Sequence, residues 1–257
     1  MPGQSESVDL PAGALNRPLA VASLGPGSRL VSWGFPVVRD ASKRQKVRCA
    51  VGVYLTSERK WQTYGDYSRV HATAVSNDGS KVAFIADEAD SQTRELLVLD
   101  VTNGQITKLT NIMAVSISWA PDGVRLVLGT PGGDVAPKVM VFGIDTHTAI
   151  ELADGSWPSW SPSGNWIAFF DPSHESVRLM RPDGTDNRLL KKIGGSLIAY
   201  KNFGGQPVWS PDEKKLLLNL YKGEGNSQDV VLLDIETRQM TRLSKNGSNV
   251  LGWVAQK

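Results

Sequence analysis

Two patterns recur five times along this chain of 257 residues. In the first, a tight polar turn precedes a short apolar run, at 24–33, 76–85, 120–129, 161–170 and 210–219. In the second, an apolar run is followed by a polar turn and another strand-like run, at 51–64, 96–109, 139–152, 177–190 and 230–243. The corresponding turn residues Pro26, Asp78, Asp122, Ser163 and Asp212 are 52, 44, 41 and 49 residues apart. Unrelated hairpins would not keep two patterns in phase, so the chain is a repeat protein with a period in the forties.

The apolar runs show how each repeat is buried. LLVLD (96–100) and VVLLD (230–234) are apolar at consecutive positions, whereas a strand with one covered face alternates apolar and polar residues. Sheets stacked side by side around a ring bury both faces of such strands. We therefore expect an all-β fold, a β-propeller of four-stranded antiparallel blades. A two-layer sandwich, which would show alternation, is the second choice.

Three tryptophans occupy one position of the repeat. Trp119, Trp160 and Trp209 each come just before the turn, on the first and innermost strand of the expected blade. Their large side chains are expected to fill the wedge between blades rather than to bind a ligand. Trp157 differs, since it comes before this strand, in the connection from the preceding blade.

The two ends of the chain resemble single strands of the repeat. VDLPAG (8–13) is similar to a last strand, and SNVLGWV (248–254) is similar to a first strand. We expect an N-terminal arm at 1–17, which is a candidate closing strand, and a single propeller domain at 18–257. The five clear repeats could then be joined by a partial sixth blade formed by both ends, and the sequence leaves five and six blades open.

The best repeat carries a resemblance to a known family. PSWSPSGNWIAF (158–169), followed by VRLMRPDGTDNRLL (177–190), resembles the repeat of TolB-like β-propellers, relatives of the WD-repeat proteins. The segments 117–128 and 206–218 match nearly as well, whereas Ser23 and Val75 stand where tryptophan would be expected. The resemblance covers roughly 18–254 and is specific for fold, not for activity. It implies a propeller, usually six-bladed, of the kind that serves as an envelope interaction scaffold or gates a peptidase domain.

Composition excludes several classes of protein. A formal net charge of +2 argues against a nucleic-acid-coating protein, and a single cysteine, Cys49, cannot form an internal disulfide. No run of 18 apolar residues predicts a membrane span. Residues 1–20 lack a basic segment followed by an apolar one, so the sequence as given predicts a cytoplasmic protein, or a periplasmic or secreted one if a signal peptide was removed.

Motifs for chemistry are absent from the sequence. It contains no G-x-S-x-G, no P-loop and no G-x-G-x-x-G. We expect no catalytic residue, no metal and no cofactor. ADEAD (86–90) is interpreted as a solvated hairpin tip, and the basic stretch 39–48 as a solvated loop or a patch for anions. His147 and His174 are expected on the surface in hairpin turns, whereas His71 is expected to face the channel mouth.

The connections between blades are the candidate partner site, because functional residues concentrate on loops of rigid scaffolds. The longest connection, 191–206, has glycine pairs near both ends and aromatic and polar residues between them, a composition typical of contact hot spots. The candidate residues on this rim are Tyr67, Arg69, His71, Trp157, Tyr200, Lys201, Asn202 and Phe203. Alternatively, the long connection folds back and caps the channel.

The sequence thus favours a non-enzymatic scaffold that binds a protein or peptide partner through this rim. The alternative is a propeller, and in one version an enzyme, that binds a small molecule or a metal in its channel with His71. Converging titratable groups with shifted pKa values in the channel would favour the alternative. A purely structural module would show neither feature.

Overall fold

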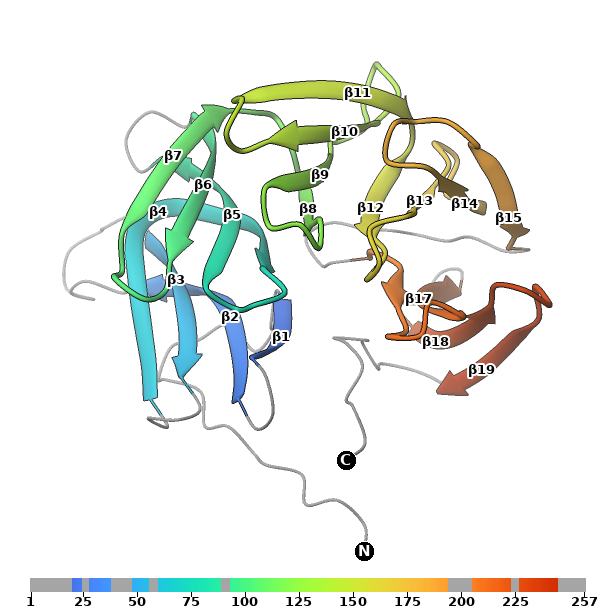
Figure 1. The fold of residues 1–257 in the computed structure, drawn as a ribbon, viewed down its shortest axis with the longest axis horizontal. Coiled ribbons are helices and arrows are strands. Elements are labelled where there is room, and N and C mark those ends of the chain that lie inside the picture. The colour runs from blue at the N-terminus through green and yellow to red at the C-terminus, as the bar shows by residue number, and fades with distance from the viewer. Residues whose placement is uncertain are drawn as a thin grey trace, which may run out of the picture.

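A computed structural model describes residues 20–24, 28–37, 48–55, 60–88, 93–193, 205–222 and 227–244. Within these ranges the chain forms nineteen strands, and none of the described elements is a helix that could span a membrane. The strands form five successive four-stranded antiparallel blades, which follow one another around a central axis (Figure 1). The prediction of an all-β propeller with five clear repeats is therefore confirmed.

Blades 3, 4 and 5 are separate sheets. Blade 3 contains β8 (Ser116–Trp119), β9 (Arg125–Gly129), β10 (Lys138–Gly143) and β11 (Thr148–Asp154). Blade 4 contains β12 (Ser156–Trp160), β13 (Ile167–Phe170), β14 (Ser176–Met180) and β15 (Arg188–Lys192). Blade 5 contains β16 (Val208–Trp209), β17 (Lys215–Lys222), β18 (Ser227–Asp234) and β19 (Met240–Ser244). The first strands β8 and β12 lie nearest the axis in Figure 1.

Blades 1 and 2 share one long strand. Blade 1 contains β1 (Ala20–Leu24), β2 (Ser28–Val37) and β3 (Arg48–Leu55), and blade 2 contains β5 (Lys81–Glu88), β6 (Arg94–Asp100) and β7 (Ile106–Asn111). Between them, β4 (Lys60–Val75) pairs with β3 through its first half and with β5 through its second half. The prediction that 65–72 is a connection is therefore wrong. These residues continue the strand, with register shifts where it passes from one blade to the next.

Tryptophan side chains join consecutive blades, as predicted. Trp119 is 5% exposed and packs in one cluster with Ile85 of blade 2 and Leu126 of its own blade. Its indole Nε1 donates a hydrogen bond to the Ala74 carbonyl oxygen on β4 at 2.9 Å. Trp209 is also buried, and its Nε1 donates to the Ser159 carbonyl of the preceding blade at 3.1 Å. Each of these two side chains thus fills the wedge and is held by a hydrogen bond across it.

Trp160 fills the next wedge in a different way. It is 5% exposed and packs with Val127 and Val139 of blade 3. Its Nε1 donates at 3.1 Å to the carbonyl of Gly164, in the turn of its own blade. The packing role is the same, but this indole stabilises its own turn rather than the neighbouring blade.

The turns between first and second strands form one end of the ring, here called the turn rim (76–80, 120–124, 161–166 and 210–214). Ser76 Oγ donates to Asp78 at 2.6 Å and accepts a hydrogen bond from the backbone N–H of Lys81 at 3.0 Å. Ser210 makes the same two contacts in blade 5, with Asp212 at 2.6 Å and the N–H of Lys215 at 2.9 Å. These repeated side-chain bonds close the turns that the sequence pattern predicted.

Neighbouring turns on the turn rim also interlock. Gly164 has a φ of +80°, and a Cβ atom there would lie 2.9 Å from Cγ of Pro121 in the preceding turn. Glycine is therefore required by both backbone conformation and contact. Ser163 in turn donates its hydroxyl to the Glu213 carboxylate of the following blade at 2.9 Å, and its backbone N–H donates to the same carboxylate.

The predicted closing strands, 8–13 and 248–254, and the arm at 1–17 lie outside the described residues. A partial sixth blade therefore stays a prediction.

Candidate functional site

The opposite end of the ring carries the connections between blades and the turns between second and third strands. We call it the connection rim, and its described parts are 65–71, 86–88, 93–95, 111–116, 130–137, 154–157, 171–175 and 205–207. It is the rim on which the sequence placed the candidate site. Here the blades differ from one another.

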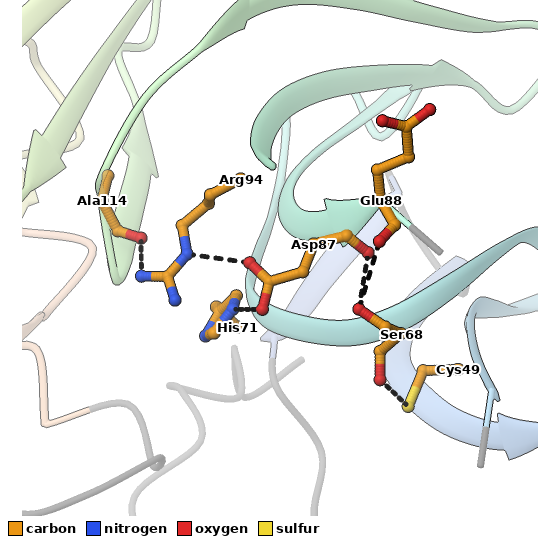
Figure 2. A network of polar contacts seen from close by, with 7 residues as sticks. All are labelled: Cys49, Ser68, His71, Asp87, Glu88, Arg94 and Ala114. Carbon is orange, nitrogen blue, oxygen red and sulfur yellow. Dashed lines mark hydrogen bonds and ion pairs between the residues drawn. The ribbon is translucent and has the colours of Figure 1, made fainter. Parts of the chain in front are cut away.

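A network of polar side chains lies on this rim in blade 2 (Figure 2). The sheet register places Arg69 on β4 opposite Asp87 on β5, and Asp87 opposite Arg94 on β6. Arg94 Nε donates to Asp87 Oδ1 at 3.0 Å. His71 Nε2 lies 2.8 Å from Asp87 Oδ2, off the line of a directed N–H···O bond, so the two groups form a close contact rather than an aligned hydrogen bond.

The network extends into both neighbouring blades. Arg94 Nη1 donates at 3.3 Å to the Ala114 carbonyl, in the connection between β7 and β8. On the other side, Ser68 Oγ donates to the Asp87 and Glu88 carbonyls at 3.2 and 3.3 Å, and the Cys49 thiol of β3 lies 3.9 Å from the Ser68 carbonyl. Figure 2 shows these contacts as one chain from blade 1 to the entry of blade 3.

Burial sets the charge states in the network. The side chains of His71, Arg94 and Asp87 are 7%, 15% and 18% exposed. Burial lowers the pKa of His71, although the contact with Asp87 opposes this effect. Burial raises the pKa of Asp87, but the contacts with His71 and Arg94 outweigh it and leave this pKa below its usual value. At neutral pH the network therefore combines a charged Asp87–Arg94 pair with a largely neutral imidazole.

This arrangement lacks the third element of a hydrolytic triad among the described residues. A histidine beside a carboxylate activates a nucleophile only when a hydroxyl or thiol lies within its reach. The Ser68 hydroxyl instead donates to two backbone carbonyls. Burial raises the pKa of the Cys49 thiol, so it stays protonated, and the described part of the chain shows no group of three His, Cys, Asp or Glu that could hold a metal. We call the network of His71, Asp87 and Arg94 the clamp, because its contacts tie the strands of blade 2 to the connection that leads into blade 3.

The structure places the predicted site residues in different environments. The Tyr67 ring is 8% exposed and packs edge-on against Phe84 at 5.4 Å, and burial raises its pKa to about 12. It belongs to the blade core, because β4 continues as a strand here, and so it is not displayed on the rim. Arg69 is exposed on the rim, and His71 lies in the clamp rather than open to the channel mouth.

Trp157 lies within β12, not in the connection before it. It has a φ of +52° at a register shift of the strand, and its half-buried side chain packs against the core between blades 4 and 5. Tyr200, Lys201, Asn202 and Phe203 lie outside the described residues, so their assignment to the rim stays a prediction.

Two other expectations need correction. Asp87, interpreted as part of a solvated hairpin tip, is a half-buried strand residue at the centre of the clamp. His174 lies in a hairpin turn as expected, but it is half-buried, and burial lowers its pKa. His147 is exposed in a turn, with Nδ1 2.9 Å from the Leu109 carbonyl of blade 2.

The connection rim also exposes apolar side chains that the sequence analysis missed. Met113 is 61% exposed and Val135 is 72% exposed. Met113 lies in the connection between β7 and β8, and Val135 lies in the loop between β9 and β10. A methionine among apolar neighbours in NIMAV (111–115) gives no signal that its side chain faces water, because exposure depends on how the connection leaves the sheet.

Gln206 is a further contact that sequence reasoning missed. Its Nε2 donates to the Ile117 carbonyl of β8 at 3.0 Å and to the Pro158 carbonyl of β12 at 2.9 Å. One amide at the entry to blade 5 thus joins the first strands of blades 3 and 4.

Comparisons with known proteins identify the fold. No family model matches the chain. The Tol-Pal system protein TolB of Francisella tularensis is 25% identical over 106 residues, which are 40% of this chain and 23% of that protein. The chain thus spans about a quarter of the length of the curated relatives that it matches.

Solved structures extend the likeness over most of the chain. TolB of Acinetobacter baumannii aligns with a TM-score of 0.66 at 17% identity, over 90% of this chain and 55% of that one. A putative TolB of Agrobacterium tumefaciens aligns with a TM-score of 0.68 at 17% identity, over 93% of this chain and 85% of that one. Together with the five described blades, these likenesses show that the chain has a TolB-like β-propeller fold.

Proposed function

We propose that this propeller is a non-enzymatic scaffold that binds a protein or peptide partner through its connection rim. The observation that carries the proposal is the exposure of two apolar side chains on this rim, Met113 and Val135, together with the buried polar clamp that holds the connection of Met113. Exposed apolar groups with polar neighbours are typical of contact surfaces.

The clamp supports this proposal because it fixes the rim before any partner arrives. The connection that carries Met113 is held by the hydrogen bond from Arg94 to the Ala114 carbonyl, one residue away. Arg94 is itself oriented by Asp87. A surface held in one conformation loses less conformational entropy on binding than a mobile loop does. The clamp thus favours recognition, and the Ser68 and Cys49 contacts argue against hydrolysis.

The relatives support the same class of function at a distance. The Francisella tularensis relative is named Tol-Pal system protein TolB, whereas the Bacillus subtilis relative, 25% identical over 141 residues, is named an uncharacterized peptidase. At 25% identity over 40% of this chain, the likeness supports a scaffold function only in general terms. It does not identify the partner.

Affinity capture from an extract of the source organism tests the proposal. The rim variants are Met113→Glu/Val135→Glu and Tyr200→Ala/Phe203→Ala. The matched controls are Val124→Glu, 43% exposed on the turn rim, and Ile150→Glu, 62% exposed on an outer strand. Each variant first passes a thermal-unfolding check. We expect a partner that wild type and both controls retain and that the rim variants lose.

Two results would contradict the proposal. A partner retained by the rim variants but lost from Val124→Glu would move the site to the turn rim. Capture of no protein by any form would weaken the scaffold hypothesis sharply, and the channel would then be screened with metals and small ligands.

A further inference from the structure

The outer strands of blade 4 differ in charge from those of the other blades. Together, β14 and β15 contain four basic residues and no acidic one: Arg178, Arg188, Lys191 and Lys192. By contrast, the third and fourth strands of blades 2, 3 and 5 contain basic and acidic residues together. Because β15 is the outermost strand of its blade (Figure 1), blade 4 has a basic outer edge.

In blades 2, 3 and 5 an ion pair joins the third strand to the fourth at one position of the repeat. The pairs are Glu95–Lys108, Lys138–Glu151 and Asp229–Arg242, and each flanks the register shift between its two strands. At the same position blade 4 has Ser176 and Leu189, and Leu189 is 45% exposed. An exposed leucine thus replaces one partner of the ion pair, and the second partner is a serine.

Two arginines of this blade are held in place by uncharged groups. Arg178 Nε donates to Asn187 Oδ1 at 2.9 Å, and its Nη2 donates to the Asn187 carbonyl at 3.3 Å. The Arg181 guanidinium lies 3.9 Å from the centroid of the Trp166 ring. Arg188 lies near the same ring, at 4.4 Å, and also pairs with Asp186 at 3.3 Å. Two of the three guanidinium groups are therefore oriented without a carboxylate to neutralise them, which leaves them able to pair with an anionic group from outside.

The backbone of β15 is the second element of the site. It pairs with β14 on one side, and no described strand pairs with its other side. An edge strand can add an extended peptide through its N–H and C=O groups. Lys191 and Lys192 form no ion pair with a residue of the described ranges. A second copy of β15 would place like charges together, whereas an acidic strand would place opposite charges together.

We propose that the outer edge of blade 4 binds an extended acidic peptide, which pairs with β15 as a fifth strand of the blade. Carboxylates of the peptide contact Arg178, Arg188 and the two lysines, and an apolar side chain of the peptide packs on Leu189. This site goes beyond the proposed function, since it uses the edge of one blade and not Met113 or Val135.

Fluorescence anisotropy at low salt tests the charge requirement. The probe is a labelled synthetic peptide in which glutamate alternates with valine, and the protein is the full chain. Lys191→Gln/Lys192→Gln should weaken binding by about fivefold, because each exposed pair contributes less than about 1 kcal/mol. The matched control is Thr148→Glu/Ile150→Glu on β11, the outermost strand of blade 3. It lowers the net charge by the same amount and should bind the peptide as wild type does.

A change in the peptide tests the strand pairing without altering the protein. Methylation of alternate backbone nitrogens keeps the charge but removes donors to β15, so it should weaken binding by about tenfold. Equal binding of the methylated peptide would overturn the pairing with β15. The proposal is also overturned if wild type does not bind the unmodified peptide, or if the lysine and β11 variants lose equal affinity.

Two further probes separate this peptide from other ligands. A peptide that alternates lysine with valine should not bind, and equal binding would overturn the charge argument. Vesicles of phosphatidylserine test for an anionic membrane surface. If they bind wild type but the acidic peptide does not, the basic edge recognises lipid and the peptide proposal is wrong. None of these outcomes depends on Met113 or Val135, so failure here is distinguishable from failure of the proposed function.

Discussion

The two rims of this propeller are built from the same blades but follow different rules. On the turn rim, Ser76 and Ser210 make the same pair of hydrogen bonds in blades 2 and 5, and adjacent turns touch through Pro121 and Gly164. On the connection rim, blade 2 has a buried ionic clamp, blade 3 exposes Val135, and blade 4 begins with a bulge at Trp157.

The difference indicates where stability and function reside. Contacts that recur in several blades hold the ring together, so they carry little information about a particular partner. Contacts that occur once, such as the hydrogen bond from Arg94 to Ala114, distinguish this propeller from others with the same fold. Substitutions on the two rims should therefore differ in kind as well as in size.

The largest expected effect is on the packing between blades, which both rims share. Trp119→Ala should lower the free energy of unfolding by about 3–5 kcal/mol, because it leaves a cavity and removes the hydrogen bond from the indole to the Ala74 carbonyl. Urea denaturation measures the change. Trp119→Phe, which keeps most of the ring volume, should cost clearly less. Equal losses for the two variants would show that the cavity is not the main cause.

Among the polar contacts compared here, those of the clamp should lose the most unfolding free energy when one partner is replaced. Asp87→Asn removes the charge that Arg94 and His71 contact, and it should cost about 2 kcal/mol of unfolding free energy. Asp122→Asn on the turn rim disturbs a more exposed pair with Arg125 and should cost less than half as much. The same denaturation experiment compares them. A larger loss for Asp122→Asn would reverse the comparison between the rims.

The half-buried histidines of the connection rim should make the stability of the fold depend on pH. Burial lowers the pKa of His71 and of His174 below the ordinary value of 6.5. Just below pH 6.5 the unfolded chain therefore binds more protons than the folded chain, so stability falls as the pH drops below this value. Thermal unfolding between pH 7.5 and about 5 measures this slope.

Replacement of the histidines identifies the source of that slope. His71→Gln/His174→Asn should flatten the dependence of Tm on pH in the same thermal-unfolding measurement. Loss of stability that begins only near pH 4 would instead indicate carboxylates such as Asp87, whose pKa lies below its usual value.

The smallest expected effect is at Glu213 on the turn rim. Its φ of +58° is costly for a residue other than glycine, but its carboxylate accepts two hydrogen bonds from Ser163. Glu213→Gly removes both the strain and the bonds, so stability should change by less than about 0.5 kcal/mol. Glu213→Ala keeps the strain and loses the bonds, and it should cost about 1 kcal/mol. A chemical denaturation series with narrow steps resolves the two variants, and equal losses would exclude this balance.

The sequence predicted the repeated part of the fold well and the unique part poorly. Blades, turns and the tryptophans between blades were predictable because each signal occurs several times in register. The strand at 65–72 was missed, because Gly65 and Asp66 are typical of a turn, while the structure accommodates Gly65 at a φ of +77° within β4.

The candidate site was predictable only as a rim. Arg69, His71 and Trp157 lie on or beside it, whereas the clamp partners Asp87 and Arg94 meet through the register of β5 and β6. The sequence alone does not predict that Asp87 and Arg94 face each other, because their pairing depends on the length of the hairpin between β5 and β6. The exposure of Met113 likewise depends on the path of a connection and not on local composition.

The most direct test of the account is site-specific photo-crosslinking on the two rims. A photoreactive amino acid is introduced at Met113 or at Val124, two exposed apolar positions on opposite rims, and each protein is irradiated in an extract of the source organism. The account predicts a defined protein adduct from position 113 and none from position 124. An adduct from position 124 alone, or equal adducts from both, would contradict the assignment of partner binding to the connection rim.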